Sequence, residues 1–548
     1  MNVNTVVTAS ILILVSCGAF VVYHMVKKTN NPPKSFMILL GFISLALFTQ
    51  WGNFQYIFPV KANNPKQREV KHVLFQWHEI WHYYTGSKYF KELGYYGLYD
   101  CYVLADYETR DSNIIGATNY NIRGLKDSYS YYPMQQAYDN AIAKYRPKFT
   151  RKRWEEFKQD FVLLRNTAAN GWINFGLFDA GFNPPPTWNV IGWSITNTLP
   201  LSKKLWRGEK PYRQALVFPW FDVLLLVLIG YLLYRSYGIF GLATFFIIYG
   251  TSYISEMRWN AGSFLRYMWL FGLAGGLCML KDKKYLAAGI FLGFSTCCRI
   301  FPFMFLIGAG ISLLIAGIRE KQWKPLKQLI IGSASIGMAM FLLGLLFFGW
   351  HSYQEFLEMI LKHKDIGFIQ SIGYRRVAIF GDWQRHTPTF MWEQGLINFK
   401  NWNMQMVEAW DQIKGAHHII WAVMIAVVLI SMLKLNASEA TLLFGGLVLF
   451  FTQILTCYYY IFLALVPAVI INKNKDVGIS NIVIFVGFIL LWMFTTYVRK
   501  LTPNGIVENY YICMAILLFF IAWIIVRAYP VLHGFYVERQ SKKASERR

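Results

Sequence analysis

The chain has 548 residues, of which 55% are hydrophobic and only 15% are charged, and its mean hydropathy is +0.31. These values exclude an ordinary soluble protein, which carries about 25% charged residues, and apolar runs long enough to cross a bilayer recur along the whole sequence. The formal net charge is +24, but the basic residues lie mostly in short gaps between apolar runs, which is typical of cytoplasmic loops. No basic patch accompanies a recognition module, so we expect a polytopic protein that contacts membrane lipids and no nucleic acid.

Two transmembrane helices are predicted within residues 1–58. The first covers about residues 6–26 and lacks the basic start of a signal peptide, which indicates an uncleaved helix with its N-terminus outside. The second covers about residues 35–58 and returns the chain to the outer face. The long polar region that follows, residues 59–213, is therefore expected to be exported.

The exported region is predicted to fold into short helices and loops. Amphipathic helices are expected near residues 65–93 and 151–168, with a Tyr-rich loop around Tyr131 between them. The run Asn183-Pro184-Pro185-Pro186 predicts a rigid stop, after which the aromatic-capped segment 188–199 begins.

The later apolar runs complete an all-α bundle of about 13 transmembrane helices. Short basic connectors should face the cytoplasm, which requires a break at Arg299-Ile300-Phe301-Pro302 so that residues 285–318 enter and leave on one side. The expected regions after residue 213 are core helices (214–349), a second exported loop (350–416), C-terminal helices (417–528) and a basic cytoplasmic tail without fixed structure (529–548). The helices of these regions are predicted at about 215–234, 238–254, 263–280, 285–299, 302–318, 327–349, 417–434, 439–456, 457–472, 479–498 and 509–527.

The stretch around Glu79 opens the exported region and is the first candidate for a reactive site. His78-Glu79-Ile80-Trp81-His82 fits the pattern His-Glu-x-x-His, in which two His on one helix bind zinc and the Glu activates water. A membrane zinc metalloprotease is therefore one hypothesis. It needs a third ligand, for which the sequence offers Glu92, Asp100 and Asp106.

A second hypothesis comes from a set of short motifs in order along residues 70–310. Glu79 stands four residues before Tyr83-Tyr84, and the later elements are Lys88-Tyr89-Phe90 with Leu98-Tyr99, Phe182-Asn183-Pro184-Pro185, and Ala287-Ala288-Gly289 with Arg299-Ile300-Phe301-Pro302. Together they resemble the GT-C superfamily of integral membrane glycosyltransferases, in particular the mannosyltransferase-like enzymes that use polyprenyl-phosphate-linked sugars.

The resemblance implies a GT-C fold and an inverting sugar transfer to a lipid or glycan acceptor at the outer membrane surface. Glu79 would be the general base, with Asp100, Asp106, Asp179 and Glu256 as other carboxylates that could serve. His78, His82, Tyr83 and Tyr84 would contact substrate. No nucleotide site or resident cofactor is expected, although a divalent cation could assist.

Cationic side chains are expected to bind the donor phosphate. Arg258 and Arg266 fall on the predicted outer face and could grip a phosphate with paired N–H groups. Arg299 lies in the break of a membrane hairpin, where an unpaired charge is costly. Arg375 and Arg376, in the second exported loop, form a further basic cluster.

These observations predict a multi-pass glycosyltransferase of a bacterial inner membrane with its active site on the periplasmic side. A lipid or glycan transporter is the main alternative outside the enzymes. The sequence shows no duplicated halves of the kind that many transporters contain.

Overall fold

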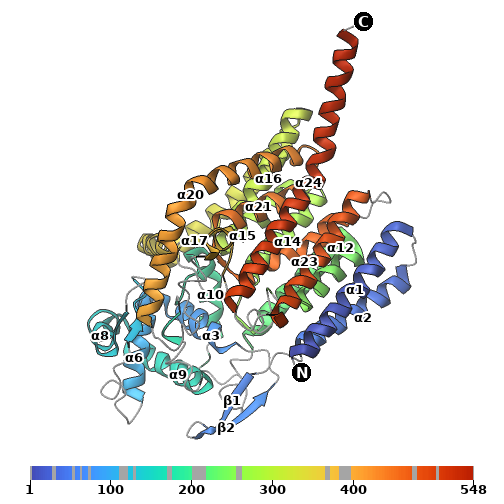
Figure 1. Cartoon of the computed structure of the whole chain (residues 1–548). Coiled ribbons are helices and arrows are strands. Elements are labelled where there is room, and N and C mark those ends of the chain that lie inside the picture. Colours follow the sequence, from blue (N-terminus) through green and yellow to red (C-terminus); the bar gives the residue numbers. More distant parts are fainter. Residues whose placement is uncertain are drawn as a thin grey trace.

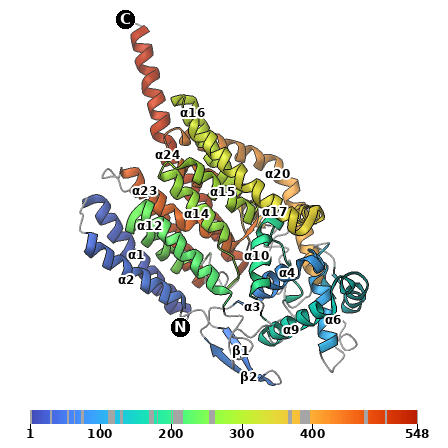
Figure 2. The same ribbon diagram turned by 180° about the vertical axis from the view of Figure 1, so that it is seen from behind.

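The computed structural model describes residues 3–27, 32–51, 56–61, 64–71, 76–109, 121–126, 131–168, 176–179, 181–199, 201, 217–252, 254, 262–363, 371–381, 396–471, 478–501 and 505–546. Apolar helices form one bundle, and the polar helices of residues 77–168 gather at one end of it (Figures 1 and 2). The C-terminal end of the last helix extends from the opposite end, whereas the N-terminus lies on the side of the polar region.

The described part of the chain contains seven helices that are long and apolar enough to cross a membrane. They are α1 (Val3–Lys27), α12 (Pro219–Gly250), α16 (Phe303–Glu320), α17 (Lys324–His363), α20 (Leu396–Met432), α23 (Ile479–Leu501) and α24 (Gly505–Glu546). Shorter apolar helices pack among them: α2 (Pro32–Trp51), α14 (Met268–Lys281), α15 (Tyr285–Cys298), α21 (Ala437–Thr452), and the 3₁₀ helix η5 (Cys457–Leu465) with α22 (Val466–Ile470). The chain is thus an all-α, multi-pass membrane protein, while the number of thirteen crossings stays a prediction.

Two of the long helices fold back on themselves at a glycine. Gly238 in α12 and Gly349 in α17 both have a φ of 73°, a conformation that glycine adopts without a Cβ clash. A Cβ placed on Gly230 would lie 2.8 Å from the ring of Phe246, so the two halves of α12 lie against each other. These halves correspond to the helices predicted at 215–234 and 238–254, and the predicted helix end at residue 349 coincides with the second fold-back.

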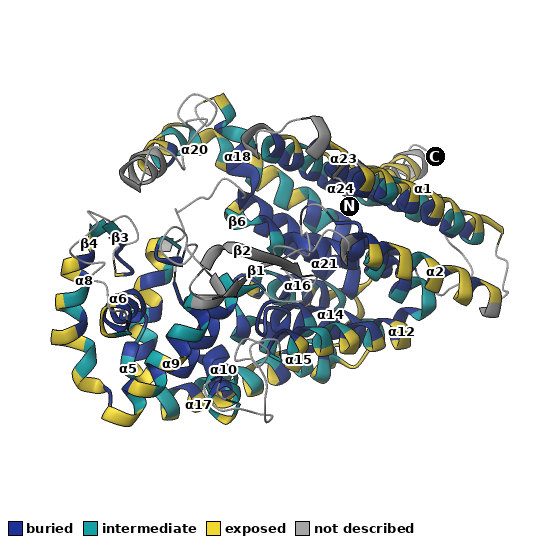
Figure 3. Ribbon diagram, turned by 90° about the horizontal axis from the view of Figure 1, so that it is seen from below, coloured by how far each residue is buried: buried dark blue, intermediate teal, exposed yellow. Residues whose placement is uncertain are grey.

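The outer surface of the bundle is apolar, as a lipid-facing surface requires. Leu45, Leu346 and Leu490 are among its exposed side chains. Seen along the bundle from the polar end, buried residues line the inward helix faces and exposed ones the outward faces (Figure 3). The apolar surface distinguishes this bundle from a soluble protein, whose helices expose a polar face over an apolar core.

The polar region consists mainly of short helices. They are α3 (Trp77–Glu79), the π-helix η1 (Ile80–Tyr84), α4 (Thr85–Lys88), α5 (Phe90–Leu93), α6 (Leu98–Thr109), α8 (Met134–Asn140), the π-helix η2 (Ala141–Tyr145), the 3₁₀ helix η3 (Arg146–Lys148), α9 (Arg151–Ala168) and α10 (Pro186–Thr198). Helix α9 confirms the predicted helix at 151–168. Helix α10 begins at Pro186, where the proline stop was predicted and where a missing N–H costs a helix nothing.

The N-terminal boundary of the polar region is wrong in the sequence prediction. Helix α2 ends at Trp51, short of residue 58, and the antiparallel strands β1 (Tyr56–Lys61) and β2 (Asn64–Lys71) follow it. The helix predicted over 65–93 therefore begins only at Trp77. Pro59 and Pro65 explain the difference, because proline interrupts helices but is tolerated in a two-stranded edge pair.

Two further segments also differ from expectation. The Tyr-rich loop contains the strand β4 (Tyr131–Pro133), paired with β3 (Asn121–Arg123). The second polar loop, predicted over 350–416, is partly helical: α17 continues to His363, α18 spans Tyr374–Ala378, and α20 starts at Leu396. The basic tail, expected to lack fixed structure, is helical to Glu546 as the end of α24.

Helices α15 and α17 approach each other closely through reciprocal glycines. A Cβ placed on Gly289 would lie 2.2 Å from the carbonyl oxygen of Leu329, and one on Gly332 would lie 2.2 Å from that of Leu286. Small residues allow membrane helices to pack backbone to backbone, which replaces the hydrophobic effect that lipid cannot supply. This contact fixes α15, and with it the break that carries Arg299.

We predict that Gly289→Val destabilises the protein by roughly 1–3 kcal/mol, because the added methyl groups force these backbones apart. Gly337→Val is the matched control, since a Cβ at this position of α17 meets no atom within 4 Å. The measurement is thermal unfolding of both variants in detergent. Equal melting temperatures for the two variants would contradict the close contact.

Candidate functional site

The stretch singled out by the sequence is a continuous helical segment that contains a π-turn. Residues 77–79 are α-helical, residues 80–84 form the π-helix η1, and residues 85–88 are α-helical again. Every side chain from Ile80 to Lys88 is buried. Single π-turns inside helices are frequent at functional sites, because the extra residue in the turn redirects the side chains on either side of it.

Glu79 forms a buried ion pair with Arg266. Their side chains are only 12% and 6% exposed. Arg266 lies in the turn before α14, directly after Leu265, whose φ of 55° is left-handed and unusual for a bulky residue. Two hydrogen bonds tie this turn to the start of α3: Gln76 N donates to Gly262 O at 2.9 Å, and Ser263 Oγ donates to Gln76 Oε1 at 3.0 Å.

A second guanidinium, that of Arg299, faces the same region. Its central carbon lies 5.3 Å from the ring centre of Tyr83 and 5.9 Å from that of Trp188. Burial raises the pKa of the Tyr83 hydroxyl, while the positive charges of Arg299 and Arg266 act against this rise, so both arginines lie near Tyr83. Arg299 itself has extended backbone between α15 and α16, which confirms the predicted break.

Aromatic side chains complete the enclosure around the two arginines. The central carbon of Arg266 lies 4.1 Å from the ring centre of Tyr458. Tyr459 stands beside it, with its ring centre 4.9 Å from that of Phe301 in the break. The Tyr83 hydroxyl donates to Asn183 Oδ1 at 2.9 Å, so the helical segment 77–88 also contacts the proline-rich stop.

The enclosure has more cationic groups than anionic partners. Nη1 of Arg266 is buried and has no hydrogen-bond partner in the described part of the chain. Among the described residues, the Arg299 guanidinium makes one hydrogen bond, to the carbonyl oxygen of Cys298 at 3.5 Å. Within this same part of the chain, Glu79 is the carboxylate that forms an ion pair with Arg266, and Arg299 has no such ion pair. The arrangement is therefore suited to an anion that offers oxygen atoms to two guanidinium groups.

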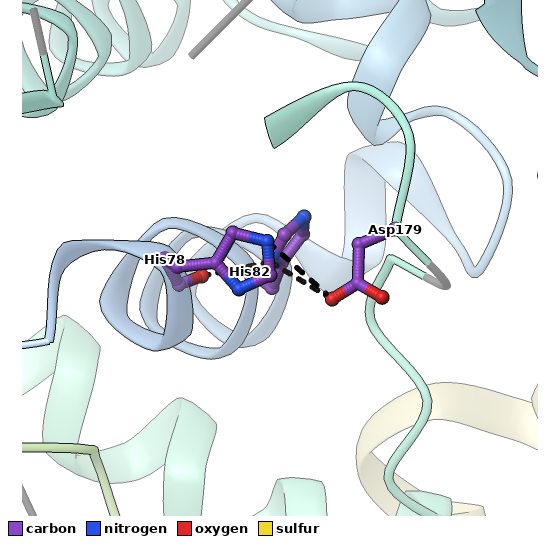
Figure 4. Close-up of side chains that lie close together, drawn as sticks. All are labelled: His78, His82 and Asp179. Carbon is purple, nitrogen blue, oxygen red and sulfur yellow. Dashed lines mark hydrogen bonds and ion pairs between the residues drawn. The ribbon is translucent and has the colours of Figure 1, made fainter. Parts of the chain in front are cut away.

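The two histidines of the His-Glu-x-x-His pattern lie beside Asp179. His78 Nε2 and His82 Nδ1 lie 3.6 Å and 3.9 Å from Asp179 Oδ2 (Figure 4). The predicted third ligands are engaged elsewhere: Glu92 pairs with Arg153 at 3.0 Å, Asp100 accepts from Tyr132 at 2.6 Å, and Asp106 pairs with Arg165 at 2.8 Å. Burial lowers the pKa of His82 to about 4.

The structure places the other predicted site residues in different surroundings. Tyr84 donates to Asp160 at 3.3 Å, within a buried network that also holds Lys88 at 2.6 Å from the same carboxylate. Arg375 and Arg376 are buried in α18, where Arg375 lies 5.7 Å from the ring centre of Trp410. Arg258 and Glu256 lie outside the described residues.

Three residues of the enclosure region were missed by the sequence prediction. Tyr458 and Tyr459 come from η5, and the signal that could have found them is a run of three tyrosines inside an apolar segment. Asp222, at the start of α12, accepts from the backbone N–H of Tyr267 at 3.0 Å and so fixes the turn that carries Arg266. A carboxylate in the first turn of a membrane helix is the corresponding signal.

Comparisons with protein-family models, with known protein sequences and with solved structures find no match for this chain.

Asp100 provides a test of the buried polar structure around the site. Burial raises the pKa of Asp100 to about 7, whereas the pKa of this side chain in the unfolded chain is near 4. As the pH rises, Asp100 therefore ionises in the unfolded chain before it ionises in the folded protein. The stability that protonated Asp100 contributes is therefore lost between about pH 4 and pH 7, by an amount on the order of 4 kcal/mol.

Asn does not titrate and can still accept the hydrogen bond from Tyr132. We predict that the melting temperature of Asp100→Asn, relative to the wild type, increases from pH 5 to pH 8. The exposed Asp139 serves as the control, and its Asn variant should follow the wild type at each pH. A constant difference between Asp100→Asn and the wild type would refute the burial effect.

Proposed function

We propose that this protein is an integral membrane glycosyltransferase that moves a sugar from a polyprenyl-phosphate donor to a lipid or glycan acceptor. The observation that carries the proposal is the buried enclosure in which Arg266 and Arg299 both lie near Tyr83, and in which Glu79 pairs with Arg266 while Arg299 has no ion pair among the described residues. The GT-C resemblance of the motifs around Glu79 and Arg299 agrees with it.

The two arginines are suited to the phosphate of the donor. Arg266 pairs with Glu79 through Nη2, and its Nη1 has no hydrogen-bond partner among the described residues. Arg299 has no carboxylate partner among these residues. A phosphate diester between them would receive charge-assisted hydrogen bonds from both. Their stabilisation increases during the reaction, because the phosphate gains negative charge as it leaves the sugar.

Aromatic rings beside the arginines are suited to the sugar and to the first lipid units. Tyr83, Trp188 and Tyr458 each lie within 6 Å of a guanidinium carbon. Flat aromatic faces bury the apolar face of a sugar, and the Tyr hydroxyls can direct its polar edge.

Glu79 is the base in this proposal. Its carboxylate accepts the proton of the acceptor hydroxyl as the hydroxyl oxygen attacks the anomeric carbon. The bond from that carbon to the phosphate oxygen breaks, polyprenyl phosphate leaves with the electron pair, and the configuration at the sugar inverts.

Zinc proteolysis is supported less well. It requires the Glu of the His-Glu-x-x-His pattern to activate a metal-bound water, whereas the Glu79 carboxylate pairs with Arg266. We place the reaction on the periplasmic side of a bacterial inner membrane. This location is supported by the site's position at the polar end of the bundle, opposite the end from which the basic C-terminal helix extends.

We predict that Glu79→Gln reduces sugar transfer by at least about 100-fold, which is the contribution expected of a general base. The assay follows release of polyprenyl phosphate from a panel of polyprenyl-phosphate hexoses in proteoliposomes that contain the full chain and an extract of lipid acceptors. Glu155→Gln, at a side chain that is 54% exposed, is the matched control and should keep wild-type activity. Full activity in Glu79→Gln would sink the assignment, and a wild type inactive on every donor would argue against a transferase.

We predict that Arg299→Gln weakens donor use, with a rise in KM for the donor and a loss of kcat, since the lost contact acts on both bound and leaving phosphate. Arg299→Lys should recover part of the activity because it keeps the charge but not the paired N–H groups. The exposed Arg235, which hydrogen-bonds to Tyr231, is the control position. If Arg299→Gln and Arg235→Gln gave the same kinetic constants, Arg299 would not bind the donor.

A further inference from the structure

We propose that His78, His82 and Asp179 form a binding site for one divalent transition metal, with Zn²⁺ as the best-suited ion. Each of the three residues offers one ligand atom, and these atoms all lie within 4.8 Å of one another. Two imidazole nitrogens and one carboxylate oxygen form a donor set that favours Zn²⁺ and its neighbours over Ca²⁺ or Mg²⁺, which prefer oxygen. This inference stands independently of the proposed sugar transfer.

The spacing of the ligand atoms is close to what a metal needs. Asp179 Oδ2 lies 3.6 Å from His78 Nε2 and 3.9 Å from His82 Nδ1 (Figure 4). Ligands about 2.0–2.1 Å from a tetrahedral zinc are about 3.3 Å apart. Rotation of the His78 and Asp179 side chains, which are 27% and 34% exposed, can bring the three ligand atoms to this spacing.

The surroundings of His82 provide a second, independent argument. Its Nε2 lies 3.1 Å from the carbonyl oxygen of Gly176 and 2.9 Å from the hydroxyl of Tyr99, which itself donates to the carbonyl oxygen of Asp179 at 3.0 Å. With the hydroxyl proton of Tyr99 donated to Asp179, Nε2 can carry the ring proton and donate it to the carbonyl oxygen of Gly176. Metal-binding histidines usually donate their other ring N–H to a carbonyl or carboxylate oxygen in this way.

The remaining nitrogen of His82 then faces oxygen atoms that have no proton to give. Nδ1 lies 2.7 Å from the carbonyl oxygen of His78 and 3.9 Å from Asp179 Oδ2. A lone pair on nitrogen beside two oxygen lone pairs is unfavourable unless a cation lies among them. A metal ion satisfies this arrangement. A second proton on the ring would also do so, and in that case the protein would bind no metal.

The bound metal would join two parts of the site. His78 and His82 belong to the helical segment 77–88, and Asp179 lies just before the proline-rich stop whose Asn183 accepts from Tyr83. His78 and Asp179 are 27% and 34% exposed, so an ion can reach the site from solvent. Glu79 is not needed as a ligand and keeps its ion pair with Arg266.

The test is zinc binding by the purified full chain in detergent, after removal of metal with a chelator. Equilibrium dialysis against Zn²⁺ followed by metal analysis should give about one ion per chain, and Zn²⁺ should raise the melting temperature. His78→Gln and Asp179→Asn, both at partly exposed positions, should each weaken Zn²⁺ binding by roughly 10-fold or more. The same dialysis with Mg²⁺ should give no binding.

His351→Gln is the matched control, since the exposed His351 lies 3.3 Å from the carboxylate of Glu355 and outside this cluster. It should leave zinc binding unchanged. A wild-type chain that takes up no stoichiometric Zn²⁺ overturns the proposal, and so does equal affinity in Asp179→Asn and His351→Gln. Melting temperatures without metal identify any variant that fails to fold, and the wild-type result decides the matter by itself.

Discussion

The buried ion pair between Glu79 and Arg266 holds the polar region against the membrane bundle. Removing two ions from water costs several kcal/mol each, and only close pairing with additional hydrogen bonds offsets that cost. Here the carboxylate comes from the helical segment 77–88 and the guanidinium from the turn before α14. Either charge alone would be left in an enclosure of aromatic rings. The polar region is therefore placed on the bundle by an electrostatic requirement as well as by apolar contact.

The same pair leaves Nη1 of Arg266 buried and without a hydrogen-bond partner among the described residues. Glu79 pairs with Arg266, whereas Arg299 has no carboxylate partner in the part of the chain that the structure describes. A site with two unpaired arginines would repel itself and retain water, whereas a site with two carboxylates would exclude phosphate. Asp222 also supports this site. Its carboxylate accepts a hydrogen bond from the backbone N–H of Tyr267, which fixes the turn that contains Arg266.

The sequence predicted most of the membrane architecture because that architecture depends on long, local signals. Apolar runs, the break at Pro302 and helix α9 are properties of neighbouring residues, and the structure has them where they were expected. The strands β1 and β2 were missed because pairing between strands is not local and their composition resembles that of an amphipathic helix. The helices inside the second polar loop were missed because charged residues there hide the helical period.

The site was predicted only in part, again because contacts between distant segments leave no local signal in the sequence. Glu79, Arg266, Arg299 and Tyr83 were all named from the sequence, and the structure brings them together, while their roles stay predictions. Their pairing could not be predicted, because the partners lie on elements far apart in the chain. Tyr458 and Asp179 reach the site from still other segments. The sequence separation of Asp179 and His78 matches no known ligand spacing. Glu92, Asp100 and Asp106 were predicted as third ligands because they lie close to the histidines in the sequence.

The π-turn at residues 80–84 sets the directions in which the side chains before and after it point. A π-turn is equivalent to an α-helix with one inserted residue, and one residue rotates everything beyond it by roughly 100°. The turn separates Glu79, which faces Arg266, from Lys88, which faces Asp160. Deleting one residue between them would keep the helix but lose one of the two pairings. The length of this segment, more than its composition, therefore distinguishes a chain that can build this enclosure from one that only shares its fold.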